Sequence, residues 1–190
     1  MVEGRVATAK AAASTSGRKR GAAAKKAPPP VDKDRLTALR AMALHYGNAE
    51  RMARAENADN LFYPAKNGIS AELRLAFLER RPAELAVDRM RAVQESLARA
   101  ATERPDFWSV VGQIELRVLV AVSAKNLSAE VGDLISDFRD LKARVPARSM
   151  WDSVNSEARF TLEPYEASAA PAEQAAAKVL LGALASLVGD

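Results

Sequence analysis

Apolar side chains recur every three or four positions along most of the chain after residue 32, which is the spacing of one helical face. The fullest set comprises Phe107, Val110, Val111, Ile114, Val118 and Val122, with Leu116, Leu119 and Val120 on a second side. A helix that is apolar on most faces is buried between neighbours, so we predict that this segment lies at the centre of the core. No alternating apolar run is bounded by a hairpin turn, and the pattern therefore favours helices over strands.

Capping and breaking residues divide this pattern into eight predicted helical segments. The segments are predicted to begin near Asp34, Ala49, Asp59, Pro82, Asp106, Ser128, Ser149 and Pro171. We expect Gly47 and Asn48 to interrupt the chain between the first two segments, and Pro164 to close the seventh, because proline disrupts a helix interior. Asp106 is a predicted N-cap, and the stretch from Ser149 to Asp152 has the form of a capping box.

The predicted helices pair off along the chain. The pairs span residues 60–104, 107–144 and 149–188, so each unit is about 40 residues long, and repeated helix pairs of this length are typical of a solenoid. We therefore predict an all-α domain over residues 32–190, built of stacked antiparallel helix pairs in a tetratricopeptide-like α-solenoid. A compact helical bundle is the structural alternative.

Positive charge is concentrated at the start of the chain. Residues 1–30 hold seven basic residues against Glu3 alone, a net charge of +6, whereas the whole chain carries +4, so the remainder is slightly acidic. With no large apolar residue after Val6 and three consecutive prolines at its end, the segment 1–31 is predicted to be a disordered, Ala/Lys/Pro-rich tail.

The tail has two interpretations. It is either a basic arm for nucleic acid or a solubilising extension, the latter including a start codon assigned too far upstream. The residues expected to contact nucleic acid in the first interpretation are Arg18, Lys19, Arg20, Lys25 and Lys26.

The residue types present give little support to catalysis. The chain has no cysteine and a single histidine, His45, which excludes thiolate and multi-histidine metal sites, and it contains no phosphate-binding glycine motif. Asp133, Asp137 and Asp140 share a helical face, but basic residues interleave with them, so a solvated face is expected. We predict a protein that is not an enzyme and has no cofactor.

Hydropathy and the chain's start bear on location. The longest candidate for an apolar run, Val118 to Ala124, is far shorter than the roughly 18 residues of a membrane span, and the start has no apolar signal region. We predict a cytoplasmic protein without membrane contact.

Three segments resemble bacterial tetratricopeptide-repeat proteins, including those related to the TRAF-binding region of stress kinases. The segment from Asn60 to Leu75 is similar to their YYP-x-x-N helix, and that from Asp106 to Leu116 is similar to their DYW helix. The segment from Ser149 to Phe160 resembles their R-x-W-D-S-V element. Lys66 departs from the pattern of the first segment. Glu157 departs from the pattern of the third, where glutamine is common at this position.

The resemblance implies a non-catalytic module that binds another protein or peptide, in a bacterial signalling or defence system. The residues it suggests for a partner groove are Tyr63, Asn67, Trp108 and Trp151. The alternative for the aromatic members is packing within the core, and a contact between two copies of the chain also stays open. Nucleic-acid association through the tail is the alternative function.

Overall fold

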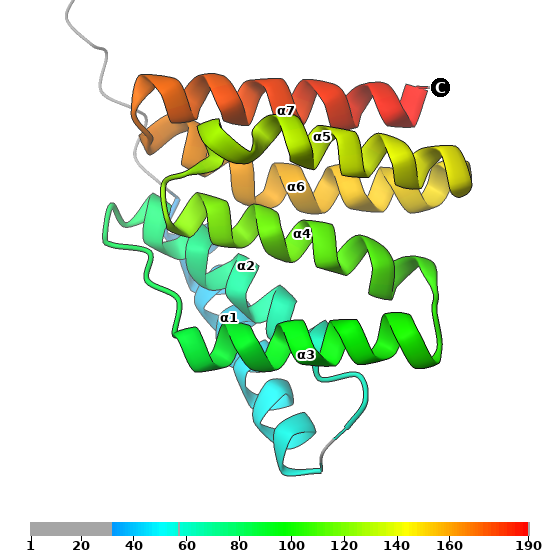
Figure 1. The fold of residues 1–190 in the computed structure, drawn as a ribbon. Coiled ribbons are helices and arrows are strands. Elements are labelled where there is room, and N and C mark those ends of the chain that lie inside the picture. Colours follow the sequence, from blue (N-terminus) through cyan, green and yellow to red (C-terminus); the bar gives the residue numbers. More distant parts are fainter. Residues whose placement is uncertain (1–31, 57, 190) are drawn as a thin grey trace, which may run out of the picture. The chain divides into compact units, whose positions relative to one another are not determined.

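The computed structural model describes residues 32–56 and 58–189, and this part of the chain forms seven helices and no strand (Figure 1). The helices are α1 (Lys33–Ala55), α2 (Phe62–Leu78), α3 (Val87–Glu103), α4 (Phe107–Ser123), α5 (Leu127–Arg144), α6 (Arg148–Ser168) and α7 (Pro171–Gly189). The prediction of an all-α domain is confirmed. The predicted tail, residues 1–31, lies outside the described residues.

Three predicted boundaries are wrong. Helix α1 continues through Gly47 and Asn48, because Gly47 keeps a helical φ and a glycine inside a helix costs only about 1 kcal/mol. Helix α3 begins at Val87 and not at Pro82, since the intervening segment is held by a hydrogen bond from the Ser123 hydroxyl to the carbonyl of Ala83. Helix α6 continues past its proline to Ser168.

One predicted helix cap is confirmed and another is wrong. Asp106 caps α4 as expected, and its carboxylate accepts the N–H of Ser109 while the Ser109 hydroxyl accepts the N–H of Asp106. The predicted capping box at Ser149 does not form, because α6 begins one residue earlier and Ala147 occupies the cap position.

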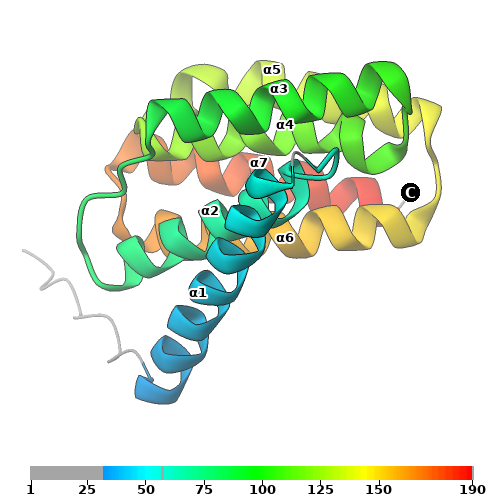
Figure 2. The ribbon, with the colours of Figure 1, turned by 90° about the horizontal axis from the view of Figure 1, so that it is seen from below.

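Helices α2, α4 and α6 run in the same direction. Lys66 of α2 pairs with Glu115 of α4, and one turn later Ser70 lines a cavity together with Val118 of α4. Arg74 of α2 contacts the Phe160 carbonyl of α6, and further along the ring of Phe77 lies 5.2 Å from that of Tyr165. Short turns join α3 to α4 and α4 to α5, so these connected helices alternate in direction (Figures 1 and 2).

Helix α4 supplies side chains to both apolar clusters of the core. The larger cluster includes Val111 and Val118 of α4 together with side chains of α5, α6 and α7, and the smaller includes Leu116 and Leu119 together with side chains of α2 and α3. At Gly112, an added Cβ would lie 2.8 Å from a methyl carbon of Leu97, so any larger residue would require the Leu97 side chain to shift. The predicted central position of this helix is confirmed.

The predicted stacking of consecutive helix pairs is not confirmed. Helix α2 packs against α6, although a stack of pairs 60–104, 107–144 and 149–188 would keep the first and third units apart. Helix α5 packs against α7, as neighbouring units of a stack also do. The α2–α6 contact brings the first and third units together, as in the bundle alternative.

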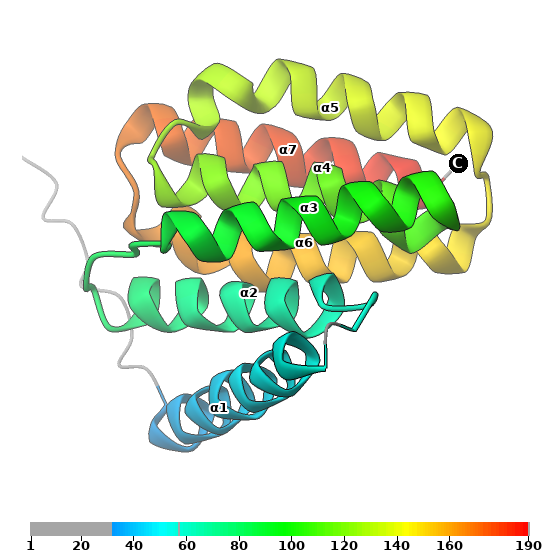
Figure 3. The same ribbon diagram turned by 60° about the horizontal axis from the view of Figure 1, so that its bottom comes forward.

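Helix α1 attaches to the bundle on one side. It packs mainly against α2 and crosses it obliquely at Gly68, where an added Cβ would lie 3.4 Å from the Cβ of Tyr46 (Figure 3). The buried carboxylate of Glu50 fixes this crossing, because it accepts hydrogen bonds from Arg54 on its own helix and from Arg89 of α3.

Helix α7 is long and apolar enough, by length and composition alone, to cross a membrane, with a mean hydropathy of 1.2. This helix was not predicted as a possible span, because its hydropathy comes from many small residues and not from one continuous apolar run. A single such helix is weak evidence, since core helices have the same composition. Here Leu180 and Leu184 pack in the larger core cluster, and the buried Glu173 bonds to the start of α5.

Candidate functional site

Helices α2 and α4 are the most deeply buried helices, and α2 nevertheless carries polar side chains along one face. Lys66, Ser70 and Arg74 are spaced four residues apart, so they lie one above the other. All three face α4 or α6, where the nearby polar side chains are Glu115, Glu157 and Thr161. We call these six residues the polar layer.

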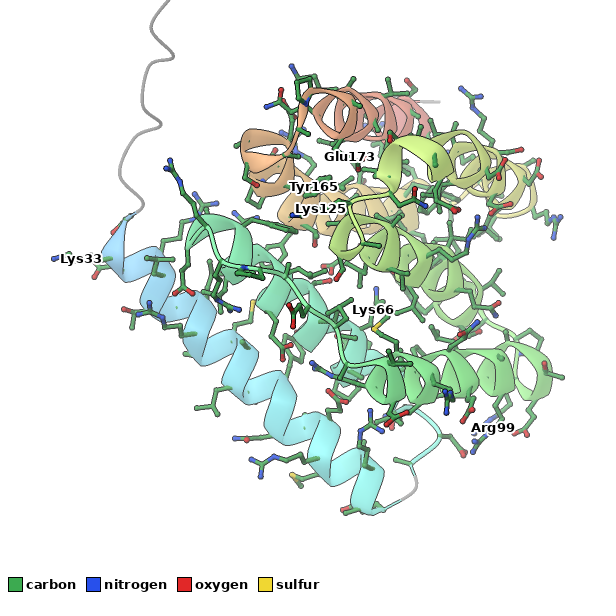
Figure 4. All side chains as sticks on the ribbon, turned by 60° about the vertical axis from the view of Figure 1, so that its left-hand side comes forward. Lys33, Lys66, Arg99, Lys125, Tyr165 and Glu173 are labelled. Atoms are coloured by element: carbon green, nitrogen blue, oxygen red, sulfur yellow. The ribbon has the colours of Figure 1, made fainter. Side chains whose placement is uncertain are left out.

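The ion pair between Lys66 and Glu115 forms one end of the polar layer. Their side chains are only 12% and 11% exposed, so both charges are largely removed from water (Figure 4). Burial raises the pKa of Glu115, the ammonium of Lys66 opposes that rise, and the nearby Glu157 adds to it. The pKa of Glu115 is therefore raised overall, and the ammonium of Lys66 limits the rise that desolvation causes.

Arg74 forms the other end, and it explains how α6 continues past Pro164. Proline has no N–H, so the carbonyl of Phe160, four residues earlier, loses its helical donor. Arg74 donates to that carbonyl, and its guanidinium lies 4.4 Å from the centre of the Phe160 ring. The side chain of Arg74 thus replaces the hydrogen bond that Pro164 removes.

A double-mutant cycle tests this replacement. We expect Arg74→Met to lower the free energy of unfolding by about 2 kcal/mol, because it leaves the buried Phe160 carbonyl without a donor. In a Pro164→Ala background the restored N–H satisfies that carbonyl, so the same change should cost about 1 kcal/mol less. Urea denaturation of the four proteins measures both steps. Equal costs in the two backgrounds would show that Arg74 acts independently of Pro164.

Two half-exposed aromatic side chains lie where α2 and α4 begin. Tyr63 precedes Lys66 by one turn, and Trp108 precedes Glu115 by two, so both lie on the faces that the ion pair joins. Tyr63 and Trp108 are 57% and 45% exposed.

Tyr46 of α1 packs against α2, since a Cβ added at Gly68 would lie 3.4 Å from the Cβ of Tyr46. Burial raises the pKa of Tyr46, the electrostatic effects of Tyr63 and Glu157 raise it further, and Lys66 lowers it. Asn67 follows Tyr63 by four residues and is partly buried. We call Tyr63, Asn67 and Trp108 the aromatic edge; it contains three of the four residues that the sequence suggested for a partner groove.

The fourth suggested residue, Trp151, lies in the core. Its side chain is 1% exposed, its ring packs edge-on against Phe107 and Phe138, and its indole N–H donates to the carbonyl of Val145 at 2.7 Å. It therefore presents no surface to a partner, in agreement with the packing alternative. The suggested nucleic-acid residues, Arg18, Lys19, Arg20, Lys25 and Lys26, all lie outside the described residues.

Other candidates from the sequence do not assemble into a site. His45 is exposed on α1, beside the ring of Tyr46. Asp137 of the acidic face pairs with Arg117 of α4. Among residues 32–56 and 58–189, no three histidine, aspartate or glutamate side chains come together as metal ligands.

Sequence reasoning missed the polar layer. Lys66 and Glu157 appeared only as departures from a family pattern, and Ser70, Arg74 and Thr161 were not singled out. The available signal was the four-residue spacing of Lys66, Ser70 and Arg74 within an otherwise apolar helix. That spacing indicates a polar face, but not which helix faces it.

Comparison of the chain with protein-family models, curated proteins and solved structures finds no match. The resemblance to tetratricopeptide-repeat proteins therefore stays a prediction. Any functional conclusion has to come from the polar layer and the aromatic edge themselves.

Proposed function

We propose that residues 32–189 form a non-catalytic module that binds another protein through the aromatic edge. The observation that carries this proposal is the exposure of Tyr63 and Trp108, two large aromatic side chains at one end of the bundle. Exposed tyrosine and tryptophan side chains supply much of the energy of protein interfaces, because each buries a large area at small entropic cost.

The neighbouring polar groups suit a binding surface. Asn67 offers an amide that both donates and accepts, and the phenol of Tyr46 lies close to Tyr63. Apolar anchors surrounded by such groups are the usual anatomy of an interface. Because the polar layer and its ion pair hold α2 and α4 together beneath the edge, the two aromatic rings are presented on a rigid support.

Kinship with tetratricopeptide-repeat proteins is part of the proposal and rests on the sequence. Tyr63 and Asn67 come from the first resembling segment, and Trp108 comes from the second. A helical-repeat relationship and a role in bacterial signalling or defence follow from that resemblance alone, and the proposal of a cytoplasmic location rests on the hydropathy of the sequence.

A comparison of capture by three proteins tests the proposal. The wild type, a Tyr63→Ala/Trp108→Ala variant and a Val87→Ala/Val179→Ala control are immobilised and exposed to lysate of the source cells. Val87 and Val179 are exposed apolar residues on other helices, so the control removes similar surface elsewhere. Circular dichroism establishes that all three are equally helical.

We expect at least one protein to be captured by the wild type and the control and to fall about tenfold or more with the aromatic variant. Quantitative mass spectrometry measures the ratio. Equal capture by all three proteins would show that the aromatic edge is not the binding surface.

A further inference from the structure

A cavity of about 20 Å³ lies inside the bundle, within the polar layer. One side is formed by Lys66, Ser70, Glu115, Glu157 and Thr161. The other is apolar and is formed by side chains of α4 to α7, among them Phe138 and Leu184. We call the first group of residues the polar wall, although most of the surface that lines the cavity is apolar.

Three atoms of the polar wall are buried without a hydrogen-bond partner among the described residues: Ser70 Oγ, Thr161 Oγ1 and Glu157 Oε1. Ser70 and Thr161 are 1% and 2% exposed, so bulk water does not reach them. Buried polar atoms in native proteins are almost always paired, and an unpaired one is strongly destabilising. Since all three residues line one cavity, a single bridging group can connect them.

We infer that this cavity is a binding site for one water molecule that bridges α2 and α6. A site holds a water when it offers about 10–15 Å³ and two to four polar partners, and this cavity meets both conditions. The hydroxyls of Ser70 and Thr161 donate to the water oxygen, and the water donates to Glu157 Oε1. Each unpaired atom then has a partner of the right kind.

The charges around the cavity select water over other small ligands. A metal ion or ammonium would lie beside the ammonium of Lys66, and an anion would lie beside the carboxylates of Glu115 and Glu157. An apolar molecule would leave the Ser70 and Thr161 hydroxyls unpaired. A neutral molecule that both donates and accepts avoids all three penalties.

The water has a structural task that the direct contacts do not perform. Between the Lys66–Glu115 pair and the Arg74–Phe160 contact, no direct side-chain hydrogen bond joins α2 to α6 in the described part of the chain. A water bridging Ser70 to Glu157 and Thr161 fills this interval. It makes the polar layer continuous from one end of the interface to the other.

Oxygen-17 relaxation dispersion counts long-lived internal waters and tests the inference on the full chain. We expect a Ser70→Ala/Thr161→Val variant to hold one long-lived water fewer than the wild type. Thr161→Val keeps the shape of the side chain and removes only the hydroxyl. Ser153→Ala is the control, because the exposed Ser153 hydroxyl of α6 bonds only to a carbonyl of its own helix, and it should retain the wild-type count.

Nuclear magnetic resonance under xenon pressure provides a second test of the inference that needs no variant. Xenon enters dry apolar cavities, so a cavity that holds water should leave the methyl resonances of Val118, Val154 and Leu184 unshifted under xenon pressure. Xenon-dependent shifts of these methyls, or identical water counts in the wild type and the double variant, would overturn the inference. If the double variant does not fold, the Thr161→Val protein and the xenon experiment decide the question.

Discussion

Replacing Trp151 with alanine should lower the free energy of unfolding by about 4 kcal/mol, among the largest effects of any single substitution in this chain. The ring centroid lies 5.6 Å from that of Phe107 on α4 and 6.4 Å from that of Phe138 on α5. Truncation removes these contacts and leaves a cavity that three helices cannot close without moving. It also leaves the carbonyl of Val145 without its indole donor.

Urea denaturation followed by circular dichroism measures this loss. Trp108→Ala is the matched control, because it deletes the same side chain where it is about half exposed, and it should cost less than about 1 kcal/mol. Similar losses for the two variants would mean that Trp151 is not a core residue and would contradict the packing of α6 against α4 and α5.

Replacing Glu173 with alanine should lower the free energy of unfolding by about 3 kcal/mol. This buried carboxylate of α7 accepts the N–H groups of Leu127 and Ser128, the hydroxyl of Ser128 and the phenol of Tyr165. It thereby caps the start of α5, where Asn126 makes no side-chain cap, and joins α5, α6 and α7 at one point (Figure 4). Alanine leaves four donors without an acceptor.

Glu163→Ala provides the control, because the exposed Glu163 of α6 pairs only with Arg159 on its own helix, and its loss should cost less than about 0.5 kcal/mol. Equal losses for the two glutamates, measured by thermal or urea denaturation, would show that the four hydrogen bonds to Glu173 do not contribute to stability.

The same carboxylate makes stability depend on pH. Burial alone would raise the pKa of Glu173, but the hydrogen bonds from Ser128, Tyr165 and the backbone of Leu127 lower it overall. A carboxyl whose pKa is lower when folded than when unfolded stabilises the fold above its unfolded pKa, and this contribution is lost as pH falls through the folded value. Below about pH 4.5, the wild type should therefore lose stability more steeply than Glu173→Gln.

The sequence predicts most of these helices, because the apolar repeat and the capping residues that define a helix lie within that helix or at its ends. The apolar repeat of α4 predicts both its extent and its central position, and Asp106 predicts its start. The errors at Gly47 and Pro164 have a shared cause. A residue that weakens an isolated helix is tolerated when other contacts hold the helix, and these contacts are not local.

The contacts between distant helices are what the sequence does not reveal. In the sequence, Glu173 is an ordinary acidic residue in the first turn of a helix. Its carboxylate nevertheless accepts hydrogen bonds from residues 45 and 46 positions earlier. By sequence Arg74 is an ordinary charged residue, yet its guanidinium donates a hydrogen bond to a carbonyl 86 positions later. No short-range spacing encodes such pairings, so neither the polar layer nor the α2–α6 contact follows from periodicity.

The pairing of Arg74 with Phe160 also has a consequence for synthesis. A chain emerging from the ribosome exposes α2 long before α6 exists, so on its polar face only Lys66 finds its partner, Glu115 of α4, before α6 is made. Helices α1, α3 and α4 cover its other faces first, and the bundle closes only when the segment around Pro164 has emerged. Folding of this domain is therefore completed late, by its sixth and seventh helices.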